Sequence, residues 1–372
     1  MREVTTLGVE FVLAANAAIL LSVALLWLAN GLIGPLGLTR DWALRRRLTT
    51  TAWVSALVLP AFAFMAPHWL PTSGMNATDL LVAHFLRGNI DITATELAAI
   101  LSLRNTVPQA LLTPTTPIWT GLVLVLSAAA LLRAAYIARS AWRLHRTLAA
   151  TTVLRHIGRV TIHISSDCAV PFASRGLTRY HVVLPAYLVT DARAFRIALG
   201  HELQHIRQGD PLLELAVAAL SPIFALNPAF WALARHTRRL REHDCDAACV
   251  ARPRGNTRDY SLTLLAVANR ASADRFAPGT FSVPFLGRRQ MGHRATRSQL
   301  GNRIELLAQG PGRRANLVTT AALICALCAA LAGTAWLVRS PTDWSHERLE
   351  LSSVLNLERL ETINTLGQRP LR

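Results

Sequence analysis

The sequence contains no lysine, so all 39 of its basic residues are arginine, against 22 acidic residues and a formal net charge of +17. Charged residues make up only 16% of the 372 positions, while hydrophobic residues make up 52%. Soluble domains carry more charge and less apolar surface than this. The composition therefore argues against a soluble enzyme and predicts an integral membrane protein.

Cysteine is scarce and is not arranged as a disulfide framework. The five residues are Cys168, Cys245, Cys249, Cys325 and Cys328. An odd number cannot pair completely within one chain, and no spacing is typical of a small secreted fold. The C-x-x-C at the last two lies inside an apolar run, which argues against a redox role. We expect reduced and mostly buried thiols.

Four apolar stretches are long enough to cross the ~30 Å of hydrocarbon in a bilayer. They cover residues 8–34, 50–70, 117–138 and 315–338. Each is predicted to be helical, because a spanning segment must satisfy its own backbone hydrogen bonds. The expected fold is therefore an α-helical membrane protein with four transmembrane helices.

Arginine placement predicts how these helices are oriented. Of the 39 arginines, 26 fall between Arg139 and Arg314, a segment with only 11 acidic residues. Positive charge collects on the cytosolic side of membrane proteins. We therefore expect a multi-pass protein of the cytoplasmic (inner) membrane, with both termini extracytoplasmic and this segment cytosolic.

The predicted domain organisation follows from the spans and the charges. It comprises a three-helix membrane region (1–138) with an outer loop (71–116), a cytosolic domain (139–314), the fourth transmembrane helix (315–338) and a short extracytoplasmic tail (339–372). Sidedness explains the positive charge, and no nucleic-acid recognition motif accompanies it. Membrane lipid is thus an expected partner and nucleic acid is not.

The cytosolic segment carries an H-E-x-x-H motif, His201-Glu202-Leu203-Gln204-His205. On a helix, histidines at i and i+4 face the same way, as ligands of one metal ion must. Thr190 or Asp191 is predicted to cap this helix, which would run to Gln208. Residues 160–164 and 181–184 have the pattern of short strands, so the domain is predicted to be α+β.

A catalytic zinc ion commonly takes three protein ligands, so a third ligand is expected downstream. Glu242 is the best candidate, and Asp246 lies four residues later on the same predicted helix face. One carboxylate would bind the metal while the other fixes a histidine tautomer. The competing ligands are His243, Cys245 and Cys249, of which the cysteines are better explained as small packing residues.

Residues 211–233 are apolar enough to be taken for another span. A straight helix of that length would be ~34 Å long and would separate Glu242 from His201 by the bilayer. One metal ion could not bind both. Prolines at 222 and 228 are helix-breaking signals, so we predict a membrane-associated helical hairpin that returns to the same side.

The chain resembles the BlaR/MecR-type membrane zinc metallopeptidases, which transduce β-lactam signals, and their relatives without a sensor domain. The resemblance runs through residues 170–172, 176–185, 201–210, 227–231 and 241–248. It implies a cytosolic, gluzincin-like zinc metallopeptidase domain between the third and fourth spans. It also implies one zinc ion per chain, held by His201, His205 and Glu242, with Glu202 as the catalytic base and Asp246 as a supporting carboxylate.

The resemblance departs from the β-lactam sensors at the C-terminus, where they carry a penicillin-binding domain after the last span. Only about thirty residues follow the last predicted span here. A chain without lysine also cannot form the Ser-x-x-Lys motif of such domains. Direct acylation by a β-lactam is therefore not expected, and a separate sensor protein is an expected partner.

The resemblance implies site-specific cleavage of a cytosolic regulator, such as a transcriptional repressor, in transmembrane signalling. Two alternatives stay open from the residues. One is a quality-control membrane protease of the HtpX type, which would cleave many substrates. The other is a non-catalytic receptor with a structural metal site, closed by a fourth ligand such as Cys245 or Cys249.

Four further features of the sequence give weaker evidence of function. Tyr260, His236 and nearby arginines are candidates for stabilising the oxyanion. The strand ending at Leu184 is either an edge that pairs with substrate or a core strand. Residues 270–299 are either a regulatory or self-cleaved loop or a plain linker, and residues 347–361 either an amphipathic helix or a solvated tail.

Overall fold

The computed structural model describes residues 2–65, 77–176, 178–252, 256–273, 293–310, 312–338 and 353–357. The chain forms two compact units, which are considered separately. The first unit comprises Met1–Ala29, Thr51–Val125 and Ala321–Arg372. The second comprises Asn30–Thr50 and Leu126–Thr320, and it contains the H-E-x-x-H motif.

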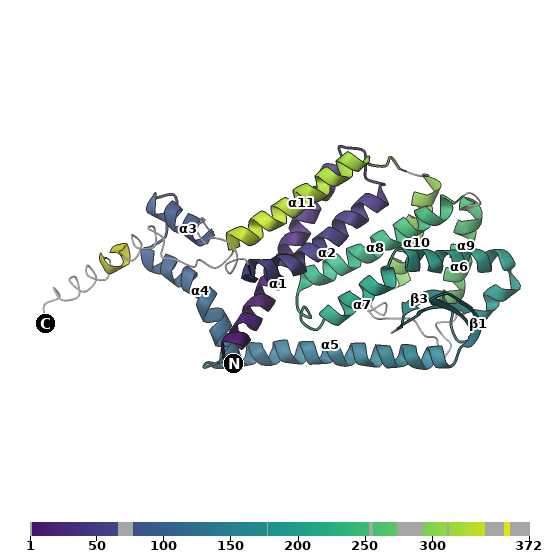
Figure 1. Ribbon diagram of the computed structural model, residues 1–372, viewed down its shortest axis with the longest axis horizontal. Helices are drawn as coiled ribbons and strands as arrows, with labels where there is room; N and C mark the ends of the chain where they lie inside the picture. The colour runs from purple at the N-terminus through teal and green to yellow at the C-terminus, as the bar shows by residue number, and fades with distance from the viewer. Residues whose placement is uncertain are drawn as a thin grey trace. The chain divides into compact units, whose positions relative to one another are not determined.

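Long apolar helices dominate the chain (Figure 1). They are α1 (Arg2–Ile33), α2 (Trp42–Met65), α5 (Pro117–Ala149) and α11 (Leu317–Val338). In the described residues, three segments are long and apolar enough to cross a membrane: Thr6–Ile33, Pro117–Ala149 and Leu317–Thr334. Three of the predicted spans are thereby confirmed as apolar helices of sufficient length, consistent with a membrane protein.

The remaining predicted span, residues 50–70, coincides partly with α2. This helix also contains the arginine cluster at positions 45–47, and Pro60 lies inside it. Residues 66–76 lie outside the described part of the chain. A fourth membrane span therefore stays a prediction.

The segment expected as an outer loop is largely helical. It forms α3 (Ala77–Leu86) and α4 (Ala94–Leu112), and a capping box between Thr93 and Glu96 begins α4. Of the predicted amphipathic tail, only residues 353–357 are described. Val354 and Leu355 pack against a buried cluster of Val82, Ala94 and Leu97. This part of the tail therefore belongs to the hydrophobic core of the first unit.

The second unit is built on a four-stranded mixed sheet. Its strands are β1 (Thr152–Ile157), β2 (Val160–Ser165), β3 (Phe172–Arg175) and β4 (Tyr180–Pro185), in the order β1-β2-β4-β3. Gly158, at φ 56°, makes the tight turn between the antiparallel β1 and β2. The two predicted strands are confirmed as β2 and β4, which pair in parallel.

The register of the sheet decides the role of the strand that ends at Leu184. β4 pairs with β2 on one side and with β3 on the other. It is therefore a core strand and not an edge that is open to substrate. Leu184 and Val182 are fully buried, as expected for a strand covered on both sides.

Helix α6 (Ala192–Arg207) follows the short 3-10 helix η2 (Ala186–Thr190) and carries the H-E-x-x-H motif. The Asp191 side chain caps it by accepting hydrogen bonds from the backbone N–H groups of residues 193 and 194. Gly209, at φ 74°, ends it in the left-handed conformation that glycine favours. Ala198, Leu199 and their neighbours pack on the sheet around Ile162 and Val182, which fixes the motif against the core (Figure 1).

The predicted hairpin forms from α7 (Asp210–Leu220) and the start of α8 (Pro228–Val250), and both helices contact α6. Proline at position 228 takes the first turn of α8, where its missing N–H is harmless. The unit is completed by α9 (Thr257–Ala273) and α10 (His293–Ala308). Most of the predicted regulatory loop, residues 274–292, lies outside the described residues.

Asn227 is expected to stabilise the hairpin as the N-cap of α8. Its buried side-chain oxygen accepts hydrogen bonds from the N–H groups of Ala229 and Phe230 at 3.0 and 3.3 Å. Asn227→Ala should lower the free energy of unfolding by about 1 kcal/mol, whereas Asn227→Asp, which keeps the acceptor, should stay near wild type. Thermal unfolding in detergent measures both, and equal losses in the two variants would contradict the capping role.

Candidate metal centre

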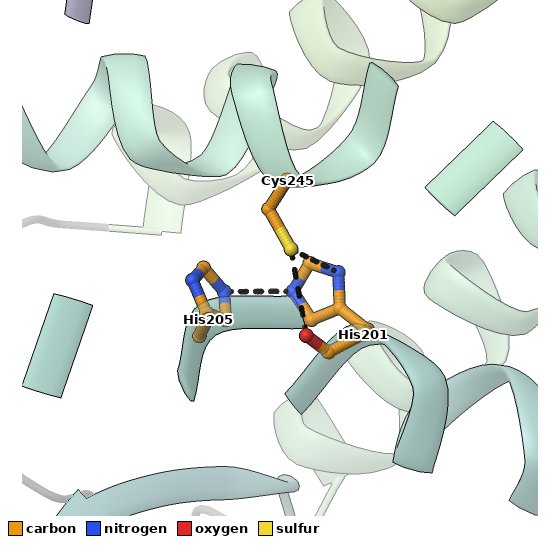
Figure 2. Close-up of side chains that lie close together, drawn as sticks. All are labelled: His201, His205 and Cys245. Carbon is orange, nitrogen blue, oxygen red and sulfur yellow. Dashed lines mark hydrogen bonds between the residues drawn. The ribbon is translucent and has the colours of Figure 1, made fainter. Parts of the chain in front are cut away.

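The two histidines of the motif lie one turn apart on α6 and converge as their spacing predicts. The Nε2 atoms of His201 and His205 are 3.1 Å apart, and the two rings are nearly perpendicular (Figure 2). Both side chains are largely buried. The structure therefore presents two imidazole nitrogens to a single point.

Glu242, on α8, faces the same point. Its carboxylate oxygens lie 4.0 Å from His201 Nε2 and 3.9 Å from His205 Nε2. The contact between α6 and α8 brings the two halves of the predicted ligand set together across forty residues of chain. The helical hairpin is what allows this, as the spacing argument required.

The distances between these donors suit a single metal ion. Ligands held at ~2.1 Å from zinc in tetrahedral geometry lie roughly 3.4 Å from one another. The observed separations of 3.1, 3.9 and 4.0 Å bracket that value, and small side-chain rotations would close the difference. Two nitrogens and one carboxylate match the protein donor set of a catalytic zinc site.

A carboxylate fixes the tautomer of His205. Its Nδ1 donates to Asp210 Oδ2 at 2.7 Å, because an ionised carboxylate can only accept. Burial by itself would lower the pKa of His205, but the hydrogen bond to Asp210 and the charges of Glu242 and Glu202 raise it to about 9. Asp210 is itself buried and also accepts from the Arg46 guanidinium at 2.9 Å. The surrounding carboxylates thus favour a positive charge at Nε2, whether a proton or a metal ion.

A longer relay fixes the tautomer of His201. The Tyr260 hydroxyl donates to Asp246 Oδ1 at 2.7 Å, so it must accept from His201 Nδ1, also at 2.7 Å. Arg303 completes the relay with two hydrogen bonds to Asp246, at 2.6 and 2.7 Å, and an ion pair with Glu242 at 2.9 Å. Both histidines thus turn Nε2 toward the same point, where the two nitrogens lie within hydrogen-bonding distance.

This relay corrects two predictions. Asp246 was expected to accept directly from a histidine, but its carboxylate oxygen is 3.7 Å from His201 Nδ1 and Tyr260 lies between them. Tyr260 was a candidate for stabilising the oxyanion, yet its hydroxyl faces Nδ1, away from the converging Nε2 atoms. Burial first, and then the charge of Asp246, raise the pKa of Tyr260 well above its usual value, which keeps it a hydrogen-bond donor.

Three supporting residues carry no local sequence signal. Asp210 was recognised only as part of the resemblance, Arg303 lies 57 residues from Asp246, and Arg46 lies 164 residues from Asp210. Ion pairs between residues so far apart in the sequence follow no helical or strand periodicity. They can therefore be identified only from the tertiary structure.

Of the competing ligands, Cys245 is the one that lies at the site. Its sulfur is 3.4 Å from Nδ1 of His201, and His201, His205 and Cys245 each offer a ligand atom within 4.8 Å of the others (Figure 2). Cys249 contacts the carbonyl oxygen of Gly200 at 3.8 Å, and the ring of His243 packs on Trp42 with centroids 4.7 Å apart. Cys245 therefore stays an alternative to Glu242 as the third ligand.

Glu202 is buried beside the two histidines on α6. Its pKa is raised, chiefly because burial disfavours the charged carboxylate, while the nearby His201 and His205 act in the opposite direction. A carboxylate with a raised pKa is suited to exchanging protons near neutral pH. Its position is compatible with the predicted role of general base.

Comparison with known proteins gives one finding about the family. The family model described as BlaR1 peptidase M56 matches residues 83–282, which is more than half of the chain. The match includes the motif helix and Glu242, but neither Arg46 nor Arg303. Among curated proteins, none matches this sequence.

Tyr260→Phe is expected to weaken metal binding without unfolding the second unit. The variant keeps the buried ring but removes the hydroxyl that joins His201 to Asp246. Losing such a supporting hydrogen bond lowers metal affinity by about 10- to 100-fold. Titration of zinc against a competing chelator measures the change.

The matched control for that experiment is Tyr187→Phe, which removes a hydroxyl that donates to the Ala169 carbonyl at 3.1 Å. Its metal affinity should equal that of wild type. An unchanged affinity in Tyr260→Phe as well would show that the relay does not support the histidine.

Proposed function

The chain belongs to the BlaR1 peptidase M56 family, and on that premise we propose that it is a membrane-bound zinc endopeptidase. The proposed metal ligands are His201, His205 and Glu242. Glu202 is the proposed general base, and Asp246 supports the site through Tyr260. Membership of the family implies a peptidase, and the three long apolar helices agree with a membrane protein.

One observation carries the proposal that a metal is bound at this point. With both Nδ1 atoms donating, the Nε2 atoms of His201 and His205 converge to 3.1 Å, with a carboxylate beside them. Two nitrogen lone pairs at this distance repel one another, so either a proton or a metal ion lies between them. Zinc prefers neutral imidazole and carboxylate ligands of this kind and leaves a position open for catalysis.

The position of each side chain indicates its role in the proposed peptide hydrolysis. A bound zinc ion would lower the pKa of water and polarise the scissile carbonyl. The Glu202 carboxylate takes a proton from the attacking water and returns it to the leaving amine. Arg303 forms ion pairs with both Glu242 and Asp246 on α8. It thereby links a proposed metal ligand to the carboxylate that supports His201 through Tyr260.

The open edge of the sheet supports the binding of an extended peptide. Among the described strands β3 is outermost, and it contacts both α6 and α7. A peptide that added to β3 by main-chain hydrogen bonds would run beside the motif helix. Main-chain hydrogen bonds to β3 would form with a peptide of any sequence, so substrate specificity would have to come from pockets that bind the peptide's side chains.

We propose that the hairpin of α7 and α8 lies at the cytosolic surface of the membrane. Large apolar side chains are exposed on α7 and in the turn that follows it: Leu212, Leu215, Ile223 and Leu226 are 54, 42, 51 and 54% exposed. Arg133 of α5 donates to Ser221 Oγ at 2.8 Å and packs over the Trp231 ring at 4.8 Å. This arginine lies ~24 Å along α5 from Pro117, about where a span reaches the far interface.

As to biological role, we propose site-specific cleavage of a cytosolic regulator, such as a transcriptional repressor, in response to a signal that a separate sensor protein detects. The proposed location is the inner membrane, with the peptidase unit cytosolic and both termini outside. The arginine distribution supports this orientation. A quality-control protease would instead cleave many unfolded membrane proteins.

Glu202→Gln should lower kcat by about 10²- to 10⁴-fold while leaving the zinc content near one ion per chain. Glu305→Gln, an exposed glutamate on α10, is the matched control and should cleave like wild type. Purified protein in detergent is assayed with candidate repressors, unfolded membrane proteins and the chain itself. If Glu202→Gln cleaves as well as wild type, Glu202 is not the general base. If both proteins bind zinc and neither cleaves, the metal site is structural and the enzyme proposal fails.

The position of the hairpin can be tested by photo-crosslinking in lipid nanodiscs. A photoreactive phenylalanine analogue at position 226 should form adducts with acyl chains, because this side chain is expected to point into the bilayer. The control is the same analogue at Val153, an exposed residue of β1 that is 47% accessible. Equal lipid labelling at both positions would argue against a membrane-facing hairpin.

A further inference from the structure

The segment that joins α1 to α2 is folded into the second unit, not into the unit that contains most of those helices. Asp41 caps the start of α2 by accepting from the Leu44 N–H, and its second oxygen accepts from the Ala315 N–H at 2.7 Å. Trp42 packs on His243, the residue after Glu242. The first turn of α2 is thus fixed against the helix that carries the third proposed ligand.

Arg46 brings the same turn to the other ligand helix. Its guanidinium donates to Asp210 Oδ1 at 2.9 Å, to Asp244 Oδ2 at 3.0 Å and to the backbone carbonyl of Gln208. These acceptors belong to the end of α6, the start of α7 and the middle of α8. One side chain therefore joins the three helices that surround the histidines.

The geometry points to a role for Arg46 in the metal site, and we propose that it is a positioning residue that sets the orientation of His205 through Asp210. The two oxygens of Asp210 are divided between the partners, because Oδ2 accepts from His205 Nδ1 and Oδ1 accepts from Arg46. The bond to Arg46 fixes the rotation of the carboxylate, and the carboxylate fixes the ring.

The proposal links the metal site to a helix of the membrane region. α2 continues as one helix from Trp42 to Met65, so a rotation about its axis displaces the Arg46 guanidinium from Asp210. The imidazole of His205 then loses the partner that holds its Nε2 toward the site. Arg46 lies outside the residues that match the family model.

The inference rests on the proposed function, since His205 must bind the metal for its orientation to matter. The experiment uses full-length protein in detergent and compares wild type with Arg46→Gln, Arg46→Lys, Asp210→Asn and the double variant Arg46→Gln/Asp210→Asn. Arg47→Gln, one residue along the same helix and exposed, is the matched control. Two readouts are taken: zinc affinity by chelator competition, and the visible absorption spectrum of the cobalt-substituted protein.

Arg46→Gln should weaken zinc binding by about tenfold and shift the cobalt spectrum, as expected for a disturbed supporting partner of a ligand histidine. Arg46→Lys should restore part of the affinity, and Arg47→Gln should change neither readout. In the Asp210→Asn background, Arg46→Gln should add little, because both changes remove the same support. Thermal unfolding identifies any variant that has lost its fold, and Arg46→Lys then carries the comparison.

Two outcomes would overturn the inference, and they are distinguishable. If wild type and Arg47→Gln bind one zinc ion but Arg46→Gln does so with the same affinity and spectrum, or if its effect adds fully to that of Asp210→Asn, Arg46 does not act through Asp210. If wild type binds no zinc, the proposed function fails, and the inference fails with it.

Discussion

The arrangement of the second unit depends on two buried hydrogen bonds from histidine Nδ1 atoms. One runs from His205 to Asp210 and the other from His201 to Tyr260, each at 2.7 Å. Each bond orients a ring, and together they turn the two Nε2 atoms toward one point. Without these partners a ring could rotate or carry its proton on the other nitrogen. The other charged residues around the site hold the two hydrogen-bond acceptors, Asp210 and Tyr260, in place.

The two supports are built differently. Asp210 is held by Arg46, whereas the Tyr260–Asp246 pair is held by Arg303, which also binds Glu242. Buried carboxylates are costly unless they are paired, so each needs a cation close by. A chain without lysine supplies both cations as arginine, whose planar guanidinium can donate to two or three acceptors at once. The arginine content, first explained by membrane sidedness, therefore also serves the interior of the site.

The helical hairpin of residues 211–233 explains how an apolar segment can lie between the two halves of the site without separating them. Residues 211–233 are mostly apolar, yet they form a helical hairpin and not one straight helix, because α7 ends at Leu220 and prolines at 222 and 228 interrupt the helix. The reversal returns Glu242 to the histidines.

The sequence by itself determined the elements whose signals are local. The motif helix with a cap at Thr190 or Asp191 and its end before Gly209, two of the strands, the hairpin and three apolar helices were predicted from spacing, capping and hydropathy. The position of Glu242 near the histidines also followed, because one metal ion limits the distance. Only the tertiary structure decided that Asp191 is the cap, that Tyr260 stands between His201 and Asp246, and that Arg303 and Arg46 supply the charges. The two arginines lie 57 and 164 residues away from the carboxylates they bind, and helix packing, which no local period encodes, brings them together.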